Sequence, residues 1–237
     1  MISIGLDPSL RNFGWSVVDT LKSGKSRRID SGHESTTVSE CQPARYLHLQ
    51  YLVRDVIKRY PSAEVIGIES PAFTGGPFAM IHHTLMMFSL VEIFLARKDC
   101  VLFDPATREY LVRNGKKGKM GKSDIQRFVQ LDTMDTSVLQ NDEADAYVIG
   151  LFAARFMEFK NDILKVANLS IAEQRVFVGR TKKVKTLSGV IEKRTAHAFR
   201  ENSRFFRFSL VPQGSVLLPT KSEINPDILA YLESLTT

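Results

Sequence analysis

The chain has 237 residues, of which 43% are hydrophobic, and its formal net charge is +6. This length suits one domain of roughly 150 residues with an extension, or one large domain. No apolar run approaches the ~20 residues that a membrane span needs, and no basic export signal opens the chain. Cys41 and Cys100 fit no metal-binding spacing. These features argue against a membrane protein or a disulfide scaffold and predict a soluble, cytoplasmic protein.

The positive charge is concentrated in the last third of the sequence. Residues 1–160 hold 20 Lys and Arg against 19 Asp and Glu, whereas residues 161–237 hold 12 against 7. Between Arg175 and Arg207 there are 10 basic and 2 acidic residues. A basic segment attached to a nearly neutral core favours a polyanionic partner, although such a segment can also be no more than a solvated surface.

The first half of the chain reads as three strands, a helix and a strand. The strands are predicted at residues 2–7, 13–18 and 25–35, the last being polar and therefore near a sheet edge. Apolar residues recur at spacings of three and four residues over residues 39–60, which predicts an amphipathic helix. The short β-branched run at 65–69 predicts a buried strand. A right-handed crossover would place this strand parallel to the first.

The second half continues with helices and one more strand. Residues 79–98 form a predicted helix that is apolar on nearly all sides, so it lies in the core or against a partner subunit. A strand at 100–103, a segment of five basic residues and three glycines at 113–122, and a capped helix from Ser123 follow. The last core helix, 142–160, has a face of small residues for close packing on the sheet, including Ala146, Gly150 and Ala153.

Together these elements predict an α/β fold in which a five-stranded mixed sheet is flanked by helices. We expect this core to span residues 1–165. Residues 166–237 would then be a basic, partly β extension, with strands over 175–179 and 184–191.

Acidic residues stand at the ends of three predicted elements. Asp7 and Glu69 each end an apolar run, and the last core helix opens with Asp142 and Asp145. Positions three apart share one helix face, so these two aspartates can point together, whereas Glu143 points elsewhere. A single strand-end glutamate is often only a solvent-exposed cap. Three acidic ends that converge would instead make one cluster of four carboxylates.

Crowded carboxylates repel one another unless cations lie between them. Mg²⁺ prefers hard oxygen ligands, and a pair of such ions can activate water and stabilise the leaving oxygen of a phosphodiester. The cluster therefore predicts a phosphodiester hydrolase with two Mg²⁺ per active site, for which Mn²⁺ would substitute.

Three segments form a set of motifs: the strand end and turn at 7–17 (DPSLRNFGWSV), the acidic strand end at Ile68 and Glu69, and the helix start at 142–146 (DEADA). This set resembles the RuvC-type Holliday-junction resolvases of the ribonuclease H-like nuclease superfamily. Their order and approximate spacing follow the family over about residues 1–160. The Gly75-Gly76-Pro77 loop departs from the family's common sequence, and Arg108 lies only near its second basic position.

The resemblance implies a ribonuclease H-like fold, a homodimer, branched DNA as the partner and metal-dependent nicking of four-way junctions in symmetrical pairs. It implies that the metal ligands are Asp7, Glu69, Asp142 and Asp145. Lys122 would be a catalytic lysine, with Lys119 as the alternate, and Phe73 or Phe78 would stack on an opened base. The residues expected to bind DNA are Arg11, Phe73, Phe78, Lys116, Lys117, Lys119, Lys122, Lys182, Lys183 and Lys185.

Three other functions compete with junction resolution. The chain could be a less selective ribonuclease H-like nuclease acting on flaps, forks or hybrids, or a junction-binding protein without catalysis. A non-catalytic binder is expected to lack one or more of the four acidic residues, and this sequence has an acidic residue at all four positions. An actin-like phosphotransferase would need glycine-rich phosphate loops from a second similar domain, and the sequence lacks them.

Overall fold

The computed structural model describes residues 1–21, 24–37, 41–70, 77–116, 118, 120–135, 137, 139–179, 181–186, 189–194 and 204–208. Its strands are β1 (Ile2–Asp7), β2 (Asn12–Thr20), β3 (Ser26–Ser35), β4 (Val65–Glu69), β5 (Asp99–Phe103), β6 (Thr181–Thr186), β7 (Gly189–Arg194) and β8 (Phe205–Phe208). Its helices are α1 (Gln42–Arg59), α2 (Pro77–Leu95), α3 (Pro105–Val112), α4 (Lys122–Thr133), α5 (Asn141–Lys160) and α6 (Ile171–Glu173). A 3-10 turn, Val166–Asn168, precedes α6, and a π-helical turn, Gln174–Val178, follows it.

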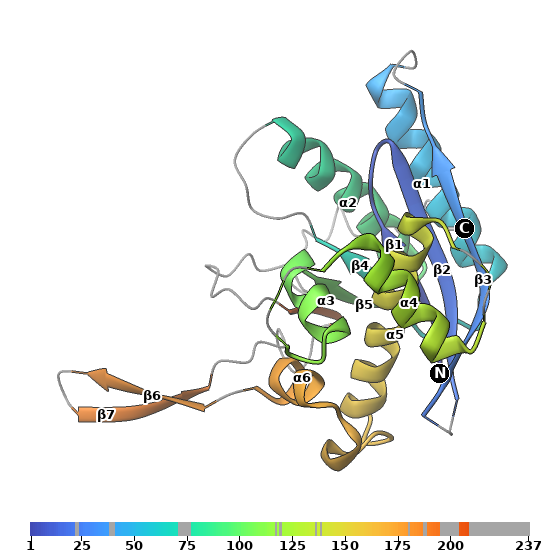
Figure 1. The fold of residues 1–237 in the computed structure, drawn as a ribbon. Coiled ribbons are helices and arrows are strands. Elements are labelled where there is room, and N and C mark those ends of the chain that lie inside the picture. Colours follow the sequence, from blue (N-terminus) through green and yellow to red (C-terminus); the bar gives the residue numbers. More distant parts are fainter. Residues whose placement is uncertain are drawn as a thin grey trace.

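The five predicted core strands and a further strand, β8, form one mixed sheet with the order β3-β2-β1-β4-β5-β8 (Figure 1). β1, β2 and β3 pair antiparallel, as their short connections predict. β4 lies parallel to β1, β5 to β4 and β8 to β5. The carboxyl ends of four strands therefore meet at one edge of the sheet.

Side-chain alternation divides the core into two layers. In β1, Ile4 and Leu6 join a buried cluster with residues of α1 and α2, while Ser3 faces α5 and donates a hydrogen bond to the Gly150 carbonyl (2.8 Å). Because successive side chains of a strand point to opposite faces, Gly5 and Asp7 lie on the same face as Ser3. The sheet thus has α1 and α2 on one side and α5 on the other.

Glycines allow α5 to lie directly on the sheet. A Cβ atom on Gly5 would lie against the Ala146 carbonyl oxygen and 2.5 Å from the Gly150 nitrogen. A Cβ on Gly67, which pairs with Gly5 across β1 and β4, would be 2.6 Å from the Ile149 carbonyl oxygen. The small-residue face predicted for this helix therefore meets a small-residue surface on the strands, and the close approach depends on both.

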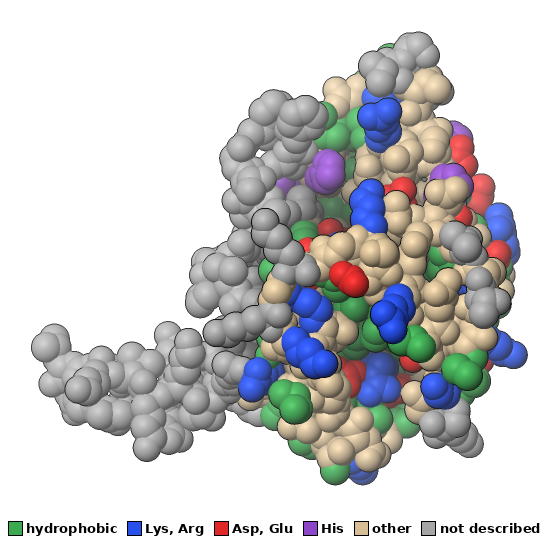
Figure 2. Space-filling view, in the orientation of Figure 1, with side chains coloured by type: hydrophobic (Ala, Val, Ile, Leu, Met, Phe, Trp, Pro, Cys, Tyr) green, Lys and Arg blue, Asp and Glu red, His purple; other side chains and the backbone are tan. Residues whose placement is uncertain are grey.

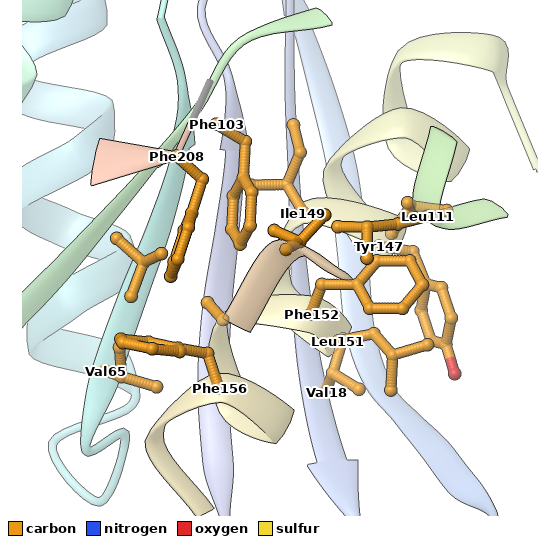
Figure 3. Close-up of a cluster of buried hydrophobic side chains, with 14 of the residues drawn as sticks. Val18, Val65, Phe103, Leu111, Tyr147, Ile149, Leu151, Phe152, Phe156 and Phe208 are labelled. Carbon is orange, nitrogen blue, oxygen red and sulfur yellow. The ribbon is translucent and has the colours of Figure 1, made fainter. Parts of the chain in front are cut away.

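A sixth strand, β8, completes the sheet beyond the five predicted. Its residues Phe206 and Phe208 are buried, and the Phe208 ring lies 4.6 Å from that of Phe156 and 5.6 Å from that of Phe103, measured between centroids. Figure 3 shows these side chains of β5, α5 and β8 in one cluster with Ile149 and Val65. A strand from the basic extension thus closes one side of the core.

Other parts of the extension differ from the prediction or stay untested. The strand predicted at 175–179 is wrong, because Gln174–Val178 continues α6 as a π-helical turn that buries Val176 and Phe177. β6 and β7 form an antiparallel hairpin, which extends to one side of the sheet in Figure 1. The domain boundary at residue 165 stays a prediction, and residues on both sides of it share one hydrophobic cluster. Among the described helices, none is long and apolar enough to cross a membrane.

Candidate active site

Two of the predicted carboxylates lie at the ends of neighbouring parallel strands. Asp7 is the last residue of β1 and Glu69 the last of β4. The strands pair Leu6 with Ile68, so the two acidic residues come one step later at the same edge. Both continue the alternation of Gly5 and Gly67 and therefore face the layer of α5.

The start of α5 brings the other two carboxylates to this edge. Asp7 pairs with Gly14 of β2, and a Cβ on Gly14 would lie against the Asp142 carbonyl and 3.0 Å from the Asp142 Cβ. α5 begins at Asn141, which puts Asp142 in its first turn and Asp145 in its second. Glu143 points away as predicted: it pairs with His33 of β3 at 3.0 Å. The four carboxylate residues therefore lie at one edge of the sheet.

An arginine that the sequence analysis did not assign lies among these carboxylates. Arg108 Nη1 is 2.6 Å from Glu69 Oε2 and 3.3 Å from Asp145 Oδ2. Its side chain is 11% exposed, compared with 16% for Glu69 and 17% for Asp145. The guanidinium therefore provides partial charge compensation inside the cluster.

Burial and mutual repulsion shift the protonation of this group. Burial, together with the charges of Glu69 and Asp145, raises the pKa of Asp7 well above its ordinary value. Burial raises the pKa of Glu69 to about 7 against the opposing effect of Arg108, and it also raises the pKa of Asp145. The pKa of Arg108 is raised: burial lowers it, but the charges of Glu69, Asp145 and Asp7 outweigh burial. One arginine is thus too little positive charge for four carboxylates.

These shifts predict a pH dependence of stability in buffer containing a chelator. A carboxyl whose pKa is higher in the folded state favours folding while it is protonated, so this contribution is lost as pH rises through the folded-state pKa. Relative to a Glu69→Gln variant, the wild type should lose on the order of 2 kcal/mol of unfolding free energy between pH 4.5 and 7. Urea unfolding across this range measures the difference.

The matched control is Glu64→Gln, which changes an exposed glutamate just before β4. Its stability should follow that of the wild type at each pH. If the difference in unfolding free energy between wild type and Glu69→Gln stayed constant from pH 4.5 to 7, this would contradict the raised pKa of Glu69.

The chemistry of the cluster fits a hard divalent cation. All its potential ligands are carboxylate oxygens, the donors that Mg²⁺ prefers. Two buried oxygens, Glu69 Oε2 and Asp145 Oδ1, accept no hydrogen bond. Within the described part of the chain, no three His, Cys, Asp or Glu side chains are placed to hold an ion in the present arrangement, and the cation that Glu69 and Asp145 do contact is Arg108.

The remaining predicted residues are only partly described. Lys122 is the first residue of α4 and is exposed, and its charge opposes the rise in the pKa of Asp145 that burial causes. Arg11 is exposed in the turn after Asp7, and Lys116 is exposed after α3. The positions of Phe73, Lys117 and Lys119, and the side chains of Phe78, Lys182, Lys183 and Lys185, lie outside the described residues.

The sequence contains a signal for Arg108 that the prediction did not use. Asp104 caps α3 by accepting hydrogen bonds from the Thr107 backbone N–H (2.9 Å) and hydroxyl (2.7 Å), and Pro105 occupies the first helical position. An aspartate followed by proline is a common helix start. A helix placed there, directly after β5, puts Arg108 beside the end of β4.

Comparison with solved structures identifies the fold. RuvC of Thermus thermophilus in complex with a Holliday junction substrate superimposes with a TM-score of 0.58 and 19% sequence identity, covering 67% of this chain and 96% of that chain. A second T. thermophilus RuvC structure superimposes with a TM-score of 0.59 and 21% sequence identity, and the coverage of both chains is the same. No protein-family model and no curated protein matches the chain by sequence. The chain therefore has the ribonuclease H-like fold of the RuvC-type Holliday-junction resolvases, as its sequence resemblance predicts.

Proposed function

We propose that this protein is a metal-dependent, structure-selective DNA endonuclease that resolves four-way junctions by paired symmetrical nicks. The observation that carries the proposal is the convergence of four carboxylates from β1, β4 and α5 at the edge where the parallel strands end. The T. thermophilus RuvC solved with a Holliday junction substrate has the same fold. Fold and acidic cluster together favour a phosphodiester hydrolase.

In this proposal each acidic residue is a metal ligand, and the lysine acts on the substrate. Asp7, Glu69, Asp142 and Asp145 would hold two Mg²⁺, for which Mn²⁺ would substitute. When bound, the ions supply an activated water and stabilise the leaving oxygen. Lys122, at the start of α4, would steady the attacked phosphate by its positive charge.

A panel of labelled substrates tests the proposal. The four-way junction should be nicked at symmetrical positions with Mg²⁺ and left intact with a chelator. A flap, a fork, an RNA–DNA hybrid and a linear duplex should be cut much more slowly. Equal cutting of all five substrates would instead establish the less selective nuclease, and junction binding without cutting would establish an architectural binder.

We propose that the basic extension adds contacts to the DNA backbone. Lys182, Lys183 and Lys185 belong to β6 of the hairpin, and Arg11, Lys116 and Lys122 are exposed. Figure 2 shows further Lys and Arg side chains scattered over the face that carries α3, α4 and α6. Deleting the whole extension would remove Val176, Phe177 and β8 from the core, so charge substitution is the better test.

Replacing Lys182, Lys183 and Lys185 together by glutamine should weaken junction binding at low salt. Each lost phosphate contact lowers the slope of log affinity against log salt by roughly 1, so we expect a slope smaller by about 2–3 in fluorescence anisotropy titrations. The control replaces Lys25, Lys58 and Lys165, which are exposed elsewhere, and should retain the wild-type slope. Identical slopes for both triple variants would remove the hairpin from the interface.

We propose a homodimer formed through α2. Met80 and Met87 are 70% and 51% exposed, and they line an apolar hollow of about 350 Å³ with His83, Thr84, Phe88 and Val91. Two equivalent nicks would match a twofold dimer. Sedimentation should show a dimer at micromolar concentration and a monomer for Met87→Lys. Met134→Lys changes a methionine at the end of α4 that is 75% exposed, and this variant should stay dimeric.

A further inference from the structure

Arg108 contacts both of its carboxylates through one nitrogen. Nη1 is the atom that lies 2.6 Å from Glu69 and 3.3 Å from Asp145. The contact with Glu69 lacks hydrogen-bond geometry, and Nε is buried without a hydrogen-bond partner. The guanidinium therefore acts as a single positive charge between two anions, which is the role that a metal ion would have there.

An ion pair between the partly exposed Arg54 and the buried Glu92 shows how a structural arginine is held. Arg54 donates to Glu92 through Nε (2.8 Å) and Nη2 (2.9 Å), and Gln50 donates to the same carboxylate (2.6 Å). This two-pronged geometry is the strong form of an arginine–carboxylate pair. By comparison, the contacts of Arg108 use little of its hydrogen-bonding capacity. Replacing its guanidinium by another cation would therefore break fewer hydrogen bonds than at Arg54.

We propose that Arg108 and a divalent cation compete for Glu69 and Asp145, so that metal binding displaces the guanidinium from the cluster. This inference rests on the metal site of the proposed function. A divalent ion contributes twice the charge of an arginine and can be coordinated by Asp145 Oδ1, which has no hydrogen-bond partner. Arg108 would thus set the metal affinity of the site and keep the carboxylates partly neutralised between binding events.

Metal affinity in the absence of DNA tests this exchange. Mn²⁺ alone is titrated and free Mn²⁺ is measured by electron paramagnetic resonance. Arg108→Met should bind Mn²⁺ about tenfold more tightly than the wild type, because the competing charge is gone. Arg108→Lys keeps the positive charge, so its Mn²⁺ affinity should stay nearer that of the wild type. Arg113→Met removes a guanidinium that lies 3.9 Å from Glu109 and should change the affinity less than about threefold.

A measurement on the wild-type protein keeps the test independent of how well the variants fold. With ¹⁵N-labelled arginine, the Nε–H signal of Arg108, assigned by its loss in Arg108→Lys, should shift as Mg²⁺ is added. The midpoint should equal that of metal binding, while the Arg54 signal stays in place. An Arg108 signal that does not move as the site fills would overturn the exchange.

The outcomes separate this inference from the proposed function. If Asp7→Asn weakens Mn²⁺ binding and the wild type cuts junctions, but Arg108→Met binds Mn²⁺ no more tightly than the wild type, only the exchange is overturned. If Mn²⁺ binding does not depend on Asp7, both the metal site and the exchange are overturned.

Discussion

Replacing Asp7 by asparagine is expected to abolish junction cutting and to leave junction binding intact. The substitution keeps the shape of the side chain but removes one charged ligand of the proposed metal site. Metal ions contribute several kcal/mol of transition-state stabilisation, so we expect the single-turnover rate to fall by roughly 10³-fold or more. Junction affinity, measured in Ca²⁺ or chelator, should change little because the phosphate contacts come from basic residues.

The same substitution should stabilise the fold when a chelator is present. Burial and the neighbouring Glu69 and Asp145 charges raise the pKa of Asp7, so its ionised form is unfavourable in the folded protein. Loss of activity together with a higher melting temperature is the pattern expected of a metal ligand whose negative charge is repelled by neighbouring carboxylates. A lower melting temperature would contradict this expectation.

Glu143→Gln is the matched control for Asp7→Asn. Glu143 belongs to the same acidic helix start, but its carboxylate accepts a hydrogen bond from Ser31 (3.3 Å) and pairs with His33, both on β3. Its substitution should leave the cutting rate within about threefold of the wild type. Wild-type cutting by Asp7→Asn, or equal losses in both variants, would remove Asp7 from the mechanism.

The substitution Gly5→Ala is expected to be among the most destabilising single changes in the protein. The added Cβ would meet backbone atoms of Ala146 and Gly150, which cannot rotate away as a side chain can. Overpacking of this kind costs about 3 kcal/mol or more. For a chain of this length the melting temperature should fall by roughly 10 °C, which differential scanning calorimetry measures.

Gly5→Ala should also lower activity at temperatures where the variant remains folded. The displaced α5 carries Asp142 and Asp145, while Asp7 stays on β1, so the separation of the ligands would change. The control is Gly121→Ala: at this exposed glycine the nearest atoms to an added Cβ are side-chain oxygens at 3.6 and 3.7 Å. It should cost less than about 1 kcal/mol, and an equal loss in both variants would contradict a specific role for the contact of α5 with β1.

Much of the site could be predicted because the evidence lies in short segments. Asp7 and Glu69 each end a short apolar run, which places them at strand ends. Parallel pairing of the two strands then requires that those ends meet. The three-residue spacing of Asp142 and Asp145 places them on one helix face. The small residues of α5 predict its close packing on the sheet, and the structure adds Gly5 and Gly67 as the matching surface on β1 and β4.

The residues that were missed depend on contacts between distant segments. Arg108 is an ordinary basic residue until α3 places it over the end of β4. β8 is a short stretch of four residues after a basic segment, and only its pairing with β5 and the buried rings of Phe156 and Phe177 make it a core strand. Residues 174–178 (QRVFV) end in three consecutive apolar side chains that favour a strand, yet packing on the core stabilises a helical turn there.

By itself the sequence determined which side chains carry negative charge and at which end of which element they stand, because local hydrophobic patterning controls strand and helix formation. Only the tertiary structure decided which cation contacts Glu69 and Asp145 and which strand closes the sheet. Both outcomes depend on the relative burial of groups far apart in the chain, and the energies of burial and charge pairing exist only once those groups are brought together.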